Sequence, residues 1–167
     1  MPALALGLEG KEPNIMRRKP RPKNDGIFAG GVATDIIYQG IVITALIMFS
    51  YFVGVYIDTG IWQITTSPHG ISMAFLTMCM VGCFHSLNLR SRRESIFKLK
   101  KQNWILLASV VVSLILTTIV CEVPAIASAF KLTELGITEW LISIGLGLAI
   151  IPIVEVVKFF QRKLKKF

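Results

Sequence analysis

Four long apolar runs constrain this chain more than any other feature of its sequence. A helix rises about 1.5 Å per residue, so about 20 apolar residues are enough to cross the hydrocarbon layer of a membrane. The runs cover residues 36–57, 71–89, 104–121 and about 137–157. Pro152 lies inside the last run, and we expect it to kink that helix. The sequence therefore predicts an all-α membrane protein, folded as a single bundle of four transmembrane helices.

Charged residues are sparse and gather mainly between these runs. Charged residues make up 17% of the chain, whereas a soluble domain has about 25%. Hydrophobic residues make up 53%, against about 45–50% in a soluble domain. The net charge of +8 is explained by the Lys and Arg that membrane proteins collect in their cytoplasmic loops. We therefore expect no nucleic-acid partner.

The distribution of the basic residues predicts the orientation of the chain. Lys and Arg number six in residues 1–31, none in 58–69, six in 90–102, one in 123–139 and five in 158–167. If the helices alternate in direction, seventeen of the eighteen lie on one side. By the positive-inside rule, both termini and the loop 90–102 are cytoplasmic. Trp62, Trp104 and Trp140 stand at the ends of runs, as aromatic belts require.

These boundaries divide the chain into seven segments. Residues 1–31 are expected to form the end of a preceding membrane helix and a cytoplasmic loop, so that the fold is a four-helix bundle with a helical N-terminal remnant. No positive segment precedes the first apolar residues, so we expect no signal peptide. The four membrane helices are expected at 32–57, 70–89, 103–122 and 137–160. The basic cytoplasmic loop is expected at 90–102 and the basic cytoplasmic tail at 161–167.

Polar side chains within or beside the runs are candidates for function, because a buried polar group without a partner costs several kcal/mol, roughly. His85 and Asn88 lie one turn apart on one helix face. We expect them to hydrogen-bond across the bundle; lining an ion path is the alternative. Glu155 is either an ion- or proton-binding carboxylate or, as we expect, the i, i+3 partner of Lys158. Asp35 precedes the first run, where a negative charge favours a helix N-terminus.

The cysteines and several small residues indicate packing. Cys79, Cys83 and Cys121 all lie in apolar runs, so we expect small hydrophobic side chains and neither disulfides nor a metal site. Two pairs of small residues have the spacing that lets membrane helices approach closely, namely Ser50 with Gly54 and Ser143 with Gly147.

The sequence contains no phosphate-binding loop, no nucleophile with its base and no metal motif. We therefore expect no catalytic, cofactor-binding or metal-binding residue in this chain. The loop RSRRESIFKLKKQ, residues 90–102, is suited to anionic lipid headgroups, at about 1 kcal/mol per basic residue, or to a cytoplasmic domain.

Several motifs, in order, resemble the C-terminal part of the type II cation-transporting P-type ATPases, most closely the calcium pumps. PALALGLEG and EPNIMRRKPRPKN resemble the end of the family's sixth membrane helix and the loop after it. GISMAFLTM and FHSLNLRSRRESIF resemble the eighth helix and its following loop, NWILLASVV the ninth helix, and LGITEWLISIGLG the tenth. The four predicted spans then correspond to the seventh to tenth helices of the family.

The resemblance implies a scaffold role in ATP-driven cation export, with Mg and ATP as cofactors of the complete pump. The DKTGT motif, whose aspartate is phosphorylated in the family, is not in this sequence, so we expect the chain alone to be inactive. The implied partners are the remaining pump helices, the cytoplasmic domains and a bilayer with anionic headgroups, in the plasma membrane.

The resemblance also carries over to single residues. Some members place a cation-ligating side chain on the eighth helix, but the matching position here is Gly82, which has no side chain to ligate. Loop residues 13–24 are expected to contact the phosphorylation domain. The structural or coupling candidates are Pro2, Arg17, Arg18, Arg21, His85, Asn88 and Glu155.

Two alternatives stay open. The first is a stand-alone four-span membrane protein that regulates or associates with a complete pump. The second is an autonomous channel or exchanger that uses His85, Asn88 and Glu155.

Overall fold

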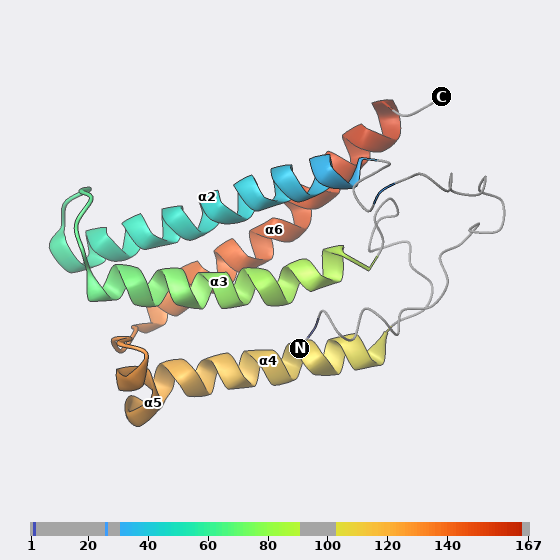
Figure 1. The fold of residues 1–167 in the computed structure, drawn as a ribbon. Coiled ribbons are helices and arrows are strands. Elements are labelled where there is room, and N and C mark those ends of the chain that lie inside the picture. Colours follow the sequence, from blue (N-terminus) through green and yellow to red (C-terminus); the bar gives the residue numbers. More distant parts are fainter. Residues whose placement is uncertain (1, 3–25, 27–30, 91–102, 165–167) are drawn as a thin grey trace.

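The computed structural model describes residues 2, 26, 31–90 and 103–164, and most of these lie in helices (Figure 1). The described part of the chain contains no strand. Four of its helices are long and apolar enough to cross a membrane, which confirms the predicted all-α membrane bundle. The helices are α2 (Val32–Thr59), α3 (Pro68–Asn88), α4 (Trp104–Glu122), the short α5 (Pro124–Ala129) and α6 (Ile137–Leu164).

Local sequence explains where these helices begin and end. Ser67 caps α3, because its hydroxyl accepts a hydrogen bond from the Gly70 amide at 3.1 Å, and Pro68 occupies the first turn, where no donor is needed. Asn103 caps α4 in the same way. Gly60 ends α2 with a φ of +72°, a conformation that glycine adopts at little cost.

Consecutive long helices run in opposite directions (Figure 1). One end of the bundle, here called the basic end, therefore holds the starts of α2 and α4 and the ends of α3 and α6. This alternation is the one that the charge count assumed. Trp104 is exposed at the basic end, and Trp62 is exposed near the opposite end.

Helix α3 is the centre of the bundle. It packs against α2, α4 and α6, and 56% of its apolar stretch is buried, against 17–22% in the other three spans. One core cluster, built on Leu76 and Met80 of α3, includes Cys121 of α4. The other joins Val81 of α3 to Ile150 and Val154 of α6. The outer sides of α2, α4 and α6 expose large apolar side chains, as lipid-facing helices do.

The α2–α3 contact depends on small residues. A Cβ added at Gly54 would lie 2.7 Å from the Cα of Gly70, so only hydrogen fits between the two backbones. One turn earlier, the hydroxyls of Ser50 and Thr77 are hydrogen-bonded at 2.6 Å. The packing role predicted for Ser50 and Gly54 is therefore confirmed.

The α3–α6 contact uses the second predicted pair. A Cβ added at Gly147 would lie 2.7 Å from the Cβ of Met80, and Ser143 is fully buried one turn earlier. Helix α6 continues through Pro152 as one helix, and the predicted kink stays a prediction. Most of the predicted N-terminal remnant and loop, and residues 91–102 of the basic loop, lie outside the described residues.

Candidate functional site

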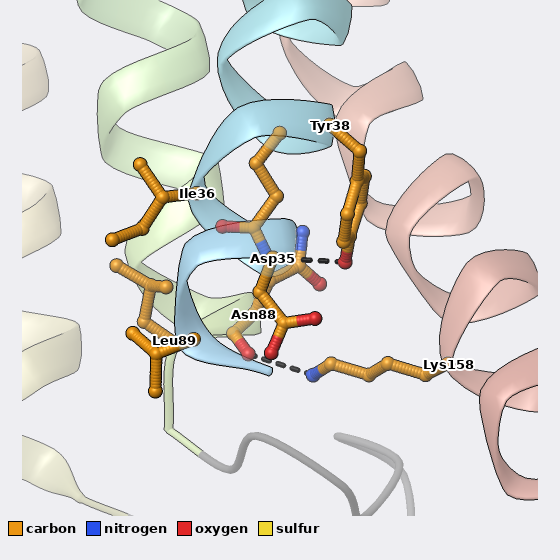
Figure 2. Close-up of a pocket in the computed structure, with 8 residues that line it drawn as sticks. Asp35, Ile36, Tyr38, Asn88, Leu89 and Lys158 are labelled. Carbon is orange, nitrogen blue, oxygen red and sulfur yellow. Dashed lines mark hydrogen bonds between the residues drawn. The ribbon is translucent and has the colours of Figure 1, made fainter. Parts of the chain in front are cut away.

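A cavity of about 230 Å³ lies at the basic end, where α2 begins, α3 ends and α6 passes beside them (Figure 2). Its lining mixes apolar, polar and charged side chains: Val32, Asp35, Ile36, Tyr38, Gln39, Asn88, Leu89 and Lys158. In Figure 2, Asp35 of α2 and Lys158 of α6 reach the same hollow from different helices. At this end of the bundle, charged side chains therefore point into the bundle as well as towards water.

Lys158 is the most constrained charged group of this cavity. It is 3% exposed, although Phe159 and Phe160 beside it are more than half exposed. Its Nζ donates a hydrogen bond to the backbone oxygen of Asn88 at 2.7 Å. The last carbonyls of a helix carry partial negative charge and lack partners within the helix. Lys158 therefore caps the C-terminus of α3 and ties it to α6.

Asn88 makes a second tie between the same two helices. Its Nδ2 donates to the backbone oxygen of Ile150 at 3.2 Å, so the hydrogen bond predicted across the bundle is confirmed for this residue. The carbonyl of Ile150 also identifies the facing amide atom as nitrogen. The other amide atom, Oδ1, is buried and has no hydrogen-bond partner among the described residues. His85 is buried one turn earlier, and its Nδ1 likewise has none there.

The other coupling candidates are placed only in part. Glu155 lies on α6 one turn before Lys158, and the expected pair between them stays a prediction. Pro2 is helical and partly exposed. The candidates Arg17, Arg18 and Arg21 lie outside the described residues.

Gly82 lies on an open side of α3. A Cβ added there would meet nothing within 4 Å. Ile71, Met78 and Leu89 share this side and are 42–50% exposed, and we call these four residues the α3 stripe. Gly82 offers room but no ligand. In the described part of the chain, no group of three or more His, Cys, Asp or Glu could hold a metal ion.

The packing predicted for the cysteines is seen for two of them. Cys83 and Cys121 are buried, and Cys121 packs in the core cluster of Leu76 and Met80. Their role as small hydrophobic side chains is confirmed.

A polar cluster at the opposite end was not predicted. His69 Nδ1 lies 2.7 Å from Glu139 Oε1, and the other carboxylate oxygen of Glu139 accepts a hydrogen bond from the Gly136 amide. Ser67 donates to Asp58 at 2.6 Å nearby in the sequence. His69 and Glu139 are 70 residues apart, so no spacing rule could have paired them. The only available signal was an acidic residue in the first turn of a membrane helix.

Comparison with known proteins covers nearly the whole chain. Residues 1–160 match the family described as cation transporting ATPase, C-terminus. A calcium-transporting ATPase of Listeria monocytogenes is 32% identical over 99% of this chain and 18% of its own length. Calcium-transporting ATPase 1 of Bacillus cereus is 29% identical over 97% of this chain and 19% of its own. Human calcium-transporting ATPase type 2C member 1 is 23% identical over 99% of this chain and 17% of its own length. The chain thus spans less than a fifth of these relatives.

Proposed function

This chain belongs to the cation-transporting P-type ATPases, as their C-terminal membrane region, and on that premise we propose that it is the membrane scaffold of an ATP-driven calcium pump. The observation that carries the proposal is the match of residues 1–160 to this region, in a chain whose four spans pack as one bundle. Calcium is the ion in the names of the relatives. Mg and ATP then act in the cytoplasmic domains of the complete pump.

The remaining pump helices dock on the α3 stripe in this proposal. Helix α3 is the most buried span, yet it keeps one open side that includes Gly82. Without a hydrophobic force between helices in lipid, close approach at small residues favours association. Because Gly82 cannot ligate through a side chain, the cation ligands come from the docked helices.

The basic end faces the cytoplasm in the same proposal, in the plasma membrane. Seventeen of the eighteen Lys and Arg belong to segments that join the bundle at this end. Residues 13–24 then face the phosphorylation domain, and residues 90–102 lie near anionic headgroups. A stand-alone regulator is less favoured, because the chain matches the pumps themselves.

A split pump tests the proposal. The chain is co-expressed with the Listeria relative truncated before its matching region, and ATP-dependent calcium uptake is measured in inverted vesicles. We expect uptake only when both parts are present. If both parts are stable in the membrane and no uptake occurs, the proposal fails.

Two matched variants test the docking side. Gly82→Phe is expected to abolish uptake, because a large ring fills the space that the docked helices need. Gly145→Phe is the control, because Gly145 is an equally open glycine on α6. Equal uptake by the two variants would remove the α3 stripe from the interface.

A further inference from the structure

The loop between α2 and α3, residues 60–67, exposes large apolar side chains at the end of the bundle opposite the basic end. Ile61, Trp62 and Ile64 are 61%, 60% and 90% exposed. We propose that this loop folds back along the lipid-facing side of α2 and binds the interfacial layer of the bilayer, where lipid esters and headgroups lie. This inference goes beyond the proposed function and requires only that the four helices lie in a membrane.

Trp62 stacks on α2 itself. The centroid of its ring lies 4.9 Å from that of Tyr56, and the two ring planes differ by 21°. Tyr56 is 44% exposed and lies on the outer side of α2. It stands one turn before the end of the helix at Thr59, which corresponds to about 4.5 Å along the axis. The indole of Trp62 therefore lies back at the level of the last turn of the span.

Hydrogen bonds hold the loop in this position. The hydroxyl of Tyr51 donates to the backbone oxygen of Thr65 at 2.6 Å. Helix side chains lean towards the N-terminus of their helix, so this bond keeps Thr65 beside the last turns of α2. The hydroxyl of Thr59 accepts from the Ile61 amide at 3.3 Å. In Figure 1 the loop accordingly runs beside the end of α2 and does not extend beyond it along the helix axis.

The composition of the loop selects the interface over both water and hydrocarbon. Between Asp58 and His69 no residue carries a charge, and Asp58 accepts a hydrogen bond from Ser67. Trp and Tyr collect at membrane interfaces, because one end of each ring is apolar and the other forms hydrogen bonds. Irregular backbone does not enter the hydrocarbon, since its polar groups would lack partners there. The loop therefore lies at the level of the esters and headgroups, where water still reaches it.

Continuity with the outer surface of α2 favours lipid over a protein partner. Phe49 is 52% exposed and lies two turns before Tyr56 on the same side of the helix. That side faces lipid in a membrane bundle, and the stacked ring of Trp62 extends it. The loop contains no Lys or Arg, so its binding should not depend on anionic headgroups, in contrast to residues 90–102.

Tryptophan fluorescence of the 167-residue chain in nanodiscs tests the proposal. Trp104→Phe and Trp140→Phe leave Trp62 as the single indole, and both faces of a phosphatidylcholine nanodisc are open to the solution. We expect lipids brominated near the ester groups to quench Trp62 more strongly than lipids brominated near the chain ends. Aqueous acrylamide should quench it less than it quenches free tryptophan amide. Replacing part of the phosphatidylcholine by phosphatidylglycerol should change neither result.

Two variants in this background test the stack. Tyr56→Ala should weaken the bromine quenching and strengthen the acrylamide quenching, because the indole loses its support on α2. Phe49→Ala removes an exposed ring from the same side of the helix and should change neither, so equal effects of the two variants would contradict the role of the stack.

The depth of Trp62 is measured without either variant, so the proposal can fail even if a variant misfolds. Quenching by acrylamide as strong as that of free tryptophan amide, with no quenching by brominated lipid, would overturn it. The exposed side chains of the loop would then face water and be open to a soluble protein partner.

Discussion

At the scale of single residues, glycines in the spans are of two kinds. At Gly54 and Gly147 the neighbouring helix is so close that no Cβ fits, whereas Gly40 and Gly145 are open. The first kind sets the distance between helices, and the second only weakens its own helix. Sequence spacing identified the first kind because each lies four residues after a serine.

The two kinds should respond oppositely to the same substitution. Gly54→Ala places a methyl group 2.7 Å from the Gly70 backbone, so we expect a loss of about 1–3 kcal/mol in the free energy of unfolding. Gly40→Ala should cost nothing and add up to about 1 kcal/mol, because alanine favours the helix. Unfolding by SDS in mixed micelles measures both. A Gly54→Ala variant as stable as the wild type would show that the helices move apart freely.

Glu139 gives a second prediction at this scale. It is buried and accepts from both His69 and the Gly136 amide. Glu139→Leu leaves both without an acceptor and should cost about 1–3 kcal/mol of unfolding free energy, whereas Glu139→Gln keeps an acceptor oxygen and should cost less. Glu134→Gln, at an exposed position, is the control. Equal stability of Glu139→Leu and the control in the SDS titration would contradict this role.

At the scale of elements, the sequence predicted where the helices lie along the chain, but not how each helix is rotated about its own axis. The apolar runs matched the candidate membrane spans of α2, α3, α4 and α6 to within four residues, since length in lipid is fixed by bilayer thickness. Apolar and polar residues are hardly separated around α2 and α3, so the sequence does not show which side of either meets the other. The bond from Lys158 to Asn88 depends on that rotation and could not be predicted.

The start of α3 provides a prediction for an element. Ser67 accepts from the Gly70 amide and donates to Asp58, so one hydroxyl both begins the helix and fixes the loop before it. Ser67→Ala should lower the unfolding free energy by about 0.5–2 kcal/mol, the usual range for an N-cap. Ser128→Ala is the control, because that hydroxyl is exposed and bonds only within α5 among the described contacts. If both variants melt at the same temperature, the cap contributes nothing.

At the scale of the whole molecule, the sides of the bundle differ in the side chains that they expose. Most of the outer surface of α2, α4 and α6 is apolar, which lipid alone explains. The α3 stripe differs because it lies on the central helix and includes an open glycine. Lys158 and Glu139, two buried charged side chains that bond to other helices, lie instead near its two ends. The α3 stripe is therefore the side on which our proposal docks the partner helices.

The last prediction concerns the orientation of the bundle in the membrane, which decides which of its two ends faces the cytoplasmic domains of a pump. Ile64 is 90% exposed in the loop before α3, and Lys163 is exposed near the end of α6. We expect a membrane-impermeant maleimide to label Ile64→Cys in intact cells and Lys163→Cys only after permeabilisation, because the basic end is retained in the cytoplasm. The wild type is the control, since Cys79, Cys83 and Cys121 lie within spans. The reverse labelling pattern would put residues 90–102 on the side without ATP, and the scaffold proposal would then fail.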